Sequence, residues 1–498
     1  MLSLLRRLFY SRPKSRSPWL VLVGLVTAIA ITLLQPQPSA AATAQHYTDL
    51  EFPPLPEIQL PDSTRVELDN GMVVYLVEDH ELPLVSGAAT IRIGSRMEPI
   101  DKIGLAALTG ELIRTGGTRD HSAAEIDAIL EQIAASVETS IELTVGTASF
   151  SALSEDTDTV FSLFAEILQH PVFDADKFEL AKNQFRGSIA RRNDDPNDIA
   201  DRELNKLIYG ATSPYARTVE YNTLDNITRR DLVDFYANQV SPDRMILGLV
   251  GDFDTKVMKQ KVIEQFGDWS PTSSRELALP EVAPATVNGL YIVDRPDLSQ
   301  SYIEMGHLGG LRNSPDYAQL GVMNNVLNGF GGRLFDEVRS RQGLAYTVYA
   351  AWSANYDYPG LFLAGGQTRA ESTADFIRAI RGEIERIRDE AITPAELQAA
   401  KDKTLNSFIF NFADPDQTLS RLIRYEYYGY PADFIFQYQR GIEATTIADV
   451  QRVARTYLTP EDLTILVVGN AAQITPSLDS LDPDRTAQSI DISIPAAR

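Results

Sequence analysis

Apolar residues recur at helical spacing in three stretches of the chain. In each stretch they lie three or four residues apart, which places them on one face of a helix. The three sets are Ile126, Ile129, Leu130 and Ile133; Val160, Leu163, Phe164, Ile167 and Leu168; and Ile377, Ile380, Ile384 and Ile387. From Val137 to Val145 every second residue is apolar or a threonine, which predicts a strand with one buried face.

Two pairs of segments resemble each other at an almost constant distance along the chain. FDADKFELAK at 173–182 matches ITPAELQAAK at 392–401 with an offset of 219 residues. SPDRMILGLVGD at 241–252 matches TPEDLTILVVGN at 459–470 with an offset of 218. This constancy indicates an internal repeat, although two unrelated α/β domains with similar turns are the alternative. We predict one unit, helices packed on one face of a sheet, built twice.

Breaks in the pattern give the domain limits. A stretch rich in proline, serine and alanine covers 270–288 and is typical of a linker. It separates an N-terminal domain at 65–269 from a C-terminal domain at 289–475, which leaves a tail at 476–498. Residues 45–64 are rich in proline and lack periodicity, so we expect an extended arm there.

The first 44 residues have the order of a secretory signal peptide. Five basic residues come first, an apolar run from Trp19 to Leu34 follows, and small residues end the segment at Ala44. This order predicts that residues 1–44 are removed on export to a periplasm or an equivalent extracytoplasmic lumen. An uncleaved membrane anchor is the alternative, although the apolar run is short for a hydrocarbon core of about 30 Å.

Charge and cysteine content exclude several kinds of function. The formal net charge of -23 argues against nucleic acid as a partner, because binding phosphates needs a basic face. The chain has no cysteine, which excludes disulfides, thiolate nucleophiles and cysteine-based zinc sites. A transition-metal site would have to use carboxylates and histidines, and the chain has only five histidines.

Five segments together resemble a known family. They are LDNGMVVYLVED (68–79), RIGSRMEP (92–99), GLAALTGELIRTGGT (104–118), TRRDLVDFYANQVSPDRMILGLVGDFD (228–254) and GGRLFDEVRSRQGLAY (331–346). The chain is similar to the pitrilysin/insulinase family of inverted-motif zinc metallopeptidases, which includes the mitochondrial processing peptidases. The resemblance implies an α+β fold with two homologous domains, each a mostly antiparallel sheet with helices on one face, facing each other across a chamber and usually assembled as dimers.

The family's zinc-binding residues are missing from the matching positions. In the family, H-x-x-E-H on the first helix supplies two histidine ligands and the glutamate that activates the bound water. The match places Ala107 and Glu111 at the histidine positions and Gly110 at the glutamate. Where a later helix carries the third ligand, this chain has Gly187 and Ser188. The resemblance therefore implies no metal and no catalytic residue of its own.

The histidines do not suggest a replacement site. His46, His80, His121, His170 and His307 are far apart in the sequence, so none forms a short motif with another. We interpret each as a residue at the surface or at the end of a helix or strand.

The C-terminal half keeps a different family feature, an arginine and a tyrosine in the pattern R-x₆-Y. They are Arg339 and Tyr346, and the resemblance implies that they reach towards the zinc of the other domain. A guanidinium suits peptide carbonyls, and a tyrosine hydroxyl can donate to an oxyanion. The alternative is an arginine paired with Glu337 or Asp336 beside a half-buried strand tyrosine.

Two further features stay open at this point. A loop with Gly329, Gly331 and Gly332 precedes the R-x₆-Y pattern, and it is either a flexible lip that contacts substrate or the turn before a helix. A cluster of aromatic residues follows later in the chain, and we expect it in a core or an interface. Its members are Tyr425, Tyr427, Tyr428, Tyr430, Phe434 and Phe436.

Three functions remain. The first is a non-catalytic subunit of an exported heterodimeric zinc peptidase, which binds extended peptides through Arg339 and Tyr346. Its partner would be a family member with intact H-x-x-E-H that supplies the zinc. The second is a proteolytically silent scaffold or peptide-binding protein of the same fold, and the third is a peptidase with an unorthodox site.

Overall fold

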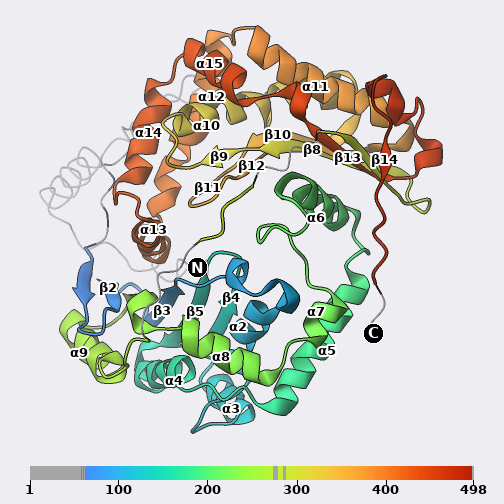
Figure 1. Ribbon diagram of the computed structural model, residues 1–498. Coiled ribbons are helices and arrows are strands. Elements are labelled where there is room, and N and C mark those ends of the chain that lie inside the picture. Colours follow the sequence, from blue (N-terminus) through green and yellow to red (C-terminus); the bar gives the residue numbers. More distant parts are fainter. Residues whose placement is uncertain (1–57, 59, 61, 273–278, 284–287, 496–498) are drawn as a thin grey trace, which may run out of the picture. The chain divides into compact units, whose positions relative to one another are not determined.

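The computed structural model (Figure 1) describes residues 58, 60, 62–272, 279–283 and 288–495. The chain divides into two units, 1–57 and 58–498, and every described helix and strand belongs to the second. The predicted signal peptide and most of the arm lie outside the described residues. Within the described ranges, no helix combines the length and the apolar character that crossing a membrane requires.

The N-terminal half contains a six-stranded sheet. Its strands are β1 (Thr64–Glu67), β2 (Val73–Glu78), β3 (Leu84–Ile91), β4 (Ser136–Ile141), β5 (Gly146–Leu153) and β6 (Met245–Gly251). The order across the sheet is β1-β2-β6-β3-β5-β4. Neighbouring strands are antiparallel except β2 and β6, which are parallel.

Eight α-helices precede, connect or follow these strands along the described part of this half. They are α2 (Leu105–Thr115), α3 (Ala123–Gln132), α4 (Thr157–Gln169), α5 (Ala175–Arg191), α6 (Pro196–Tyr209), α7 (Tyr221–Asp225), α8 (Arg229–Gln239) and α9 (Thr255–Phe266). The periodic stretches predicted as helices are α3 and α4, and all five apolar residues predicted in α4 are buried. The predicted strand from Val137 is shorter than expected. It ends at Ile141, and Leu143 and Val145 lie in the connection to β5.

The C-terminal half contains a second six-stranded sheet. Its strands are β7 (Leu290–Asp294), β8 (Gln300–Leu308), β10 (Ala345–Trp352), β12 (Leu361–Arg369), β13 (Thr464–Gly469) and β14 (Gln488–Ser489). The order is β10-β12-β8-β13-β7-β14. A separate short pair joins β9 (Gly310–Leu311) to β11 (Ala354–Asn355).

The helices of this half include one of the π type. The α-helices are α10 (Tyr317–Leu327), α11 (Thr373–Asp389), α12 (Pro394–Asn406), α13 (Pro415–Tyr428), α14 (Phe434–Ala444) and α15 (Ile447–Tyr457), and the π-helix is η6 (Phe335–Arg341). All four isoleucines predicted on one face of a helix at 377–387 are fully buried in α11.

The two sheets have equivalent topology, which confirms the predicted internal repeat. The order β2-β6-β3-β5-β4 in the first sheet corresponds to β7-β13-β8-β12-β10 in the second. Within these five strands of each sheet, one parallel pair is followed by antiparallel neighbours, whereas the outer strands differ, since β1 is antiparallel to β2 and β14 is parallel to β7. The apolar runs that carry the repeat are β6 and β13, and every residue of both strands is buried.

The halves also exchange a helix, which the sequence pattern did not predict. Helix α6 belongs to the N-terminal half but packs on β8 and β13, and α13 of the C-terminal half packs on β2, β3 and β6 (Figure 1). Leu204 and Ile208 of α6 lie in one core cluster with Leu466. Each sheet therefore has one face covered by helices of its own half and part of the other face covered by a helix of the opposite half.

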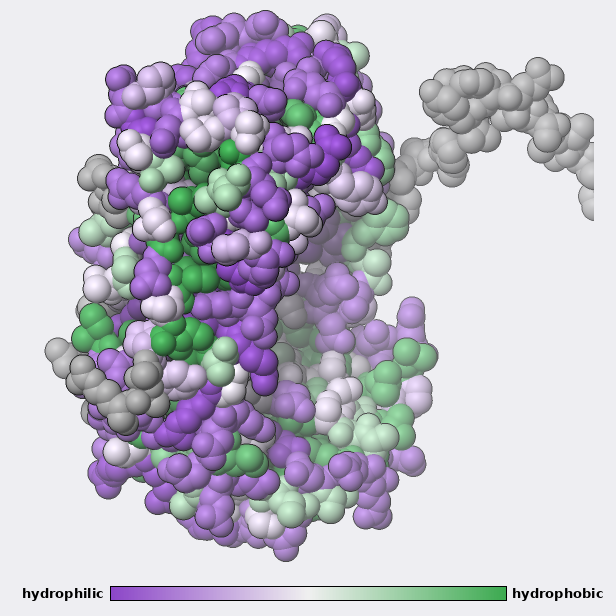
Figure 2. Space-filling view, turned by 90° about the vertical axis from the view of Figure 1, so that its right-hand side faces the viewer, coloured by the Kyte–Doolittle hydropathy of each residue, from purple (hydrophilic) through white to green (hydrophobic). Residues whose placement is uncertain are grey.

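Hydrophilic residues predominate on the face shown in Figure 2, and apolar ones are scattered among them in small groups. This face is also hollowed, and the hollow is bordered largely by hydrophilic side chains. A strongly charged surface is what the net charge of -23 leads us to expect.

Candidate functional site

Helix α2 carries the positions that correspond to the family's zinc motif, and it packs directly on the edge strand β4. A Cβ at Gly110 would lie 2.4 Å from the backbone nitrogen of Ile141 and 2.7 Å from the carbonyl carbon of Ser140. The carbonyl of Gly110 accepts a hydrogen bond from the Thr139 hydroxyl at 2.6 Å. Because main chain occupies this space, only glycine fits at the position where the family carries its glutamate.

The other two motif positions do not provide the pair of zinc ligands that the family has there. Ala107 and Glu111 are half-buried on α2, and burial raises the pKa of the Glu111 carboxyl. At the third-ligand position, Gly187 and Ser188 lie in α5, and the Ser188 hydroxyl donates to the Gln184 carbonyl. Throughout the described part of the chain, no three His, Cys, Asp or Glu side chains are grouped as metal ligands would be.

Three histidines have separate local partners. His80 contacts Asp252 at 2.6 Å, and this hydrogen bond raises the pKa of His80. His121 lies 2.9 Å from Glu166. His307 stacks on Phe362 with 5.1 Å between ring centroids, and burial lowers its pKa. Their places agree with the interpretation of each as a residue at the surface or at the end of a helix or strand, since His80 follows β2, His121 precedes α3 and His307 is next to the last residue of β8.

Arg339 is held by aromatic rings instead of by a carboxylate. Its guanidinium carbon lies 4.7 Å from the ring centroid of Phe335 and 4.4 Å from that of Tyr346. Glu337 forms its ion pair with Arg341 instead. Arg339 has no ion pair or hydrogen bond to any residue that the structure describes. Among these residues, the pairing with Glu337 or Asp336 that the sequence allowed is therefore not formed.

Tyr346 lies at a β-bulge on the edge of the second sheet. Ala345 pairs with Thr368 and Thr347 pairs with Gln367, so Tyr346 has no opposite residue. A bulge can redirect a side chain, and here 80% of Tyr346 is exposed. The π-helix η6 is the second irregular element at this place, and such turns are frequent at functional sites.

A further exposed ring extends this arrangement. Phe330 is 84% exposed, and its ring centroid lies 4.8 Å from that of Phe335. We call Phe330, Phe335, Arg339 and Tyr346 the aromatic–arginine row. The two phenylalanines were not predicted from the sequence, although their places in GFGGRLF, four to nine residues before Arg339, were a signal.

The glycine loop begins the segment that carries the row. Gly329 and Gly331 have φ of 78° and 76°, a region that L-residues with side chains rarely adopt. A Cβ at Gly332 would lie 2.4 Å from the Asn328 carbonyl oxygen. These constraints explain the glycines as a tight turn before a helix, and contact with substrate remains a prediction.

Two asparagine side chains close much of the outer edge of β10. Asn328 accepts from the backbone N–H of Ala350 at 2.9 Å, and Asn324 accepts from that of Trp352 at 2.8 Å. Both side chains also donate to the carbonyls of the same residues. By strand alternation Val348 also directs its backbone groups outwards, and it has no such partner among the described residues. The open edge at 346–348 therefore lies beside the aromatic–arginine row.

Comparisons with known proteins decide the family. "Insulinase (Peptidase family M16)" matches residues 73–220, and "Peptidase M16 inactive domain" matches residues 226–404. The chain belongs to peptidase family M16. With Ala107, Gly110 and Glu111 at the motif positions, it is a member of the M16 family that lacks the catalytic zinc site.

Several relatives of this M16 chain have names that refer to proteolysis. An uncharacterized zinc protease of Mycobacterium tuberculosis is 30% identical over 313 residues, which is 61% of this chain and 70% of the relative. A protein of Helicobacter pylori named non-peptidase homolog YmxG is 23% identical and covers 83% of this chain and 95% of its own. Both kinds of name therefore occur among its relatives.

Solved structures confirm the two-domain α+β fold of this M16 chain. A structure titled as a peptidase M16 inactive domain from Pseudomonas fluorescens has a TM-score of 0.74 at 24% identity, covering 86% of this chain and all of that one. A protease from Helicobacter pylori has a TM-score of 0.71 at 19% identity, with 82% and 100% covered.

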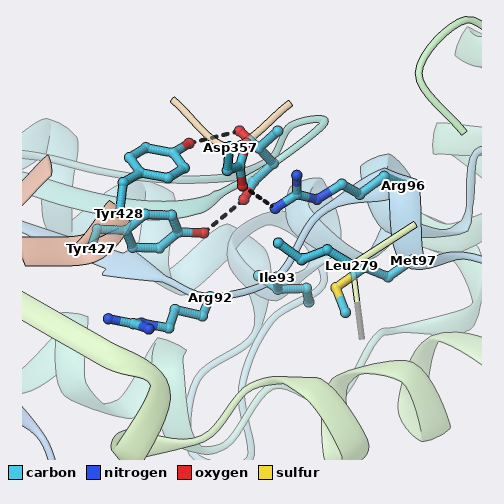
Figure 3. A pocket seen from close by; sticks show the side chains of 9 residues that line it. Arg92, Ile93, Arg96, Met97, Leu279, Asp357, Tyr427 and Tyr428 are labelled. Carbon is cyan, nitrogen blue, oxygen red and sulfur yellow. Dashed lines mark hydrogen bonds and ion pairs between the residues drawn. The ribbon is translucent and has the colours of Figure 1, made fainter. Parts of the chain in front are cut away.

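The aromatic cluster of this M16 chain forms an interface between its halves. The Tyr427 hydroxyl donates to the carbonyl of Thr144 at 2.6 Å, and the hydroxyls of Tyr428 and Thr144 are 2.9 Å apart. Close by, Arg96 and Asp357 form an ion pair of 2.7 Å (Figure 3). The Arg96 side chain is only 4% exposed. The prediction of a core or interface is confirmed for these tyrosines.

Proposed function

We propose that this M16 chain is the non-catalytic, exported subunit of a two-chain zinc peptidase. It binds an extended peptide at the aromatic–arginine row and the open edge of β10, and a family member with intact H-x-x-E-H supplies the zinc. One observation carries the proposal: Arg339 lies against the exposed Tyr346 without a carboxylate partner among the described residues, in a chain that lacks the zinc ligands at the motif positions.

The contacts of Arg339 support a role in binding a peptide. A guanidinium without an ion pair keeps its donors for carbonyl oxygens of a ligand. Stacking between Phe335 and Tyr346 restricts the side chain before binding, which lowers the entropy that binding costs. The Tyr346 hydroxyl is free to donate to an oxyanion formed at the partner's zinc.

The edge of β10 supports the same ligand class. An extended peptide can pair with an open sheet edge through main-chain hydrogen bonds. Asn324 and Asn328 occupy this edge at Ala350 and Trp352, which leaves room for such pairing only next to Tyr346. A peptide bound there would present its backbone to Arg339.

The test is peptidase activity of the mixed chains. We expect neither chain alone to cleave a peptide and the mixture to do so. Tyr346→Phe and Arg339→Ala should each lower kcat by about 10²–10³, the usual effect of losing one oxyanion donor, while the zinc content of the partner stays constant. Arg341→Ala is the matched control, because it removes an arginine of the same helix that is engaged with Glu337.

Unchanged kinetics in both variants would contradict the role of the row. If the two chains co-purify stably but no partner gives activity, the silent scaffold is the correct function, as the name of the Helicobacter relative suggests for that protein. Export is tested separately by sequencing the N-terminus of the mature protein, which we expect to begin after Ala44.

A further inference from the structure

Two adjoining cavities lie where α13 meets the first sheet. Their volumes are about 440 Å³ and about 210 Å³, and four residues line both: Thr144, Asp357, Tyr427 and Tyr428. Figure 3 shows the smaller cavity. No residue of the aromatic–arginine row contributes to either lining. This is therefore a second place on the molecule, built from both halves.

The charge of the lining is opposite to that of the whole protein. Among the described lining residues of the two cavities are four arginines, and Asp357 is the one carboxylate. The arginines are Arg92, Arg96, Arg312 and Arg424. Asp357 is already engaged by Arg96 at 2.7 Å, so the other three arginines have no carboxylate partner among the lining residues that the structure describes. In a chain of net charge -23, such a place attracts anions.

Two of these guanidiniums have most of their donors available. Arg424 is exposed and makes no hydrogen bond or ion pair within the described ranges. Arg312 donates through Nε to the carbonyl of Ala354 at 2.9 Å and lies 4.5 Å from the ring centroid of Tyr356. The stacking fixes its plane and leaves the two terminal nitrogens of the fork for a ligand.

The third guanidinium is also only weakly held. Arg92 is exposed, lies 5.5 Å from the ring centroid of Tyr427 and has one long contact, of 3.5 Å, to the carbonyl of Glu426. The side chain of Glu426 is bound to Arg65 and Tyr75. The nearest acid of α13 is therefore committed elsewhere.

The lining of the larger cavity suits a ligand with a flat or extended body. Small side chains of β3 and β5 line it, and among them are Ala88, Thr90 and Thr147. Tyrosine rings also line it, and Tyr356 and Tyr428 stack with 4.7 Å between centroids. A volume of about 440 Å³ accommodates a group of small-ligand size.

We propose that the two adjoining cavities together bind a carboxylate, through Arg424 and Arg312 of the larger one and Arg92 of the smaller one. Charge-assisted hydrogen bonds from guanidinium forks recognise carboxylates, and the tyrosine rings would contact the body attached to it. The carboxylate belongs either to the C-terminus of a peptide or to a small organic acid. The first source rests on the proposed function, whereas the site itself does not.

The experiment compares ligands that differ only in the carboxylate. Calorimetry with the full mature chain measures binding of one peptide as its free acid and as its C-terminal amide, and of phenylpropionate alone. We expect the free acid to bind about 10-fold to 100-fold more tightly than the amide, the range for one charge-assisted hydrogen bond. Arg424→Gln and Arg92→Gln should each reduce this preference, and so should high salt.

Arg421→Gln is the matched control. Arg421 lies one turn from Arg424 on α13, but its guanidinium is bound to Asn411 and does not line the cavity. Binding of phenylpropionate that depends on Arg424, with equal binding of acid and amide peptides, would assign the site to small acids. Binding of all ligands that is unaffected by Arg424→Gln and Arg92→Gln would overturn the proposal.

These outcomes are independent of the peptidase test. Carboxylate binding is measured on this chain alone, and complementation is measured on the mixture with Arg339 and Tyr346 variants. A failed complementation with intact carboxylate preference would remove the proposed function and leave this site.

Discussion

Glu304 is predicted to make the protein less stable as the pH rises. It lies on β8, where α6 packs against the second sheet. The Tyr349 hydroxyl donates to Oε1 at 3.2 Å, and Oε2 is buried with no hydrogen-bond partner among the described residues. Burial, with the charge of Asp201 on α6 as a second cause, raises the pKa of Glu304 to about 7. The informative substitution is Glu304→Gln.

The size of the effect follows from this pKa and the ordinary value of 4.5. Between the two values the folded state keeps a proton that the unfolded state has lost. Stability is therefore fully present below pH 4.5 and is lost as the pH rises towards 7. At about 1.4 kcal/mol for each pH unit, the cost reaches about 3 kcal/mol by about pH 8.

Urea unfolding of the unmodified protein and of Glu304→Gln, at about pH 5.5 and about pH 8, measures this cost in stability. A glutamine cannot ionise. The free energy of unfolding of Glu304→Gln, relative to that of the unmodified protein, should therefore increase by about 2 kcal/mol between these two pH values. Glu385→Gln, which removes an exposed glutamate of α11, should show no such increase. An advantage of the same size at both pH values would refute the reasoning, because it would mean that Glu304 does not titrate in this range.

Two other substitutions test the packing on which the sites depend. Gly110→Ala places a Cβ 2.4 Å from the backbone nitrogen of Ile141 and should lower the free energy of unfolding by about 1–3 kcal/mol. An unchanged melting temperature would show that β4 moves away at no cost. Arg96→Met leaves the half-buried Asp357 without its ion-pair partner, so we expect a loss of about 1–3 kcal/mol in denaturant unfolding. Adding Asp357→Asn should recover part of the loss, and a purely additive double variant would contradict this.

The sequence pattern predicted the units of the fold but not how they are exchanged. The spacing of apolar residues located α3, α4 and α11, and the matched segments at 241–252 and 459–470 contain the equivalent strands β6 and β13. Such a pattern says which face of a helix is buried, but it does not say which sheet covers that face. Helices α6 and α13 therefore gave no sign that each packs on the sheet of the opposite half.

The candidate sites also contain residues that the sequence could predict and residues that only the folded chain brings together. Arg339 and Tyr346 could be predicted because a continuous motif carries them. The bulge at Tyr346 and the asparagine contacts along β10 depend on pairing with other strands and helices, which no local pattern encodes. The cavity arginines come from positions 92, 312 and 424, and only the folded chain brings them together.

The surroundings of Gly110 leave no space for the zinc motif of the family. A chain that had lost only its ligands would keep space for them, and restoring three side chains would restore the site. Here the main chain of β4 lies where the side chain of a glutamate would begin, and Thr139 fixes this contact through the Gly110 carbonyl. Helix α2 would have to separate from β4 before the family motif could fit. Loss of the motif and closure of its space occur together, which supports the proposal that a second chain supplies the zinc.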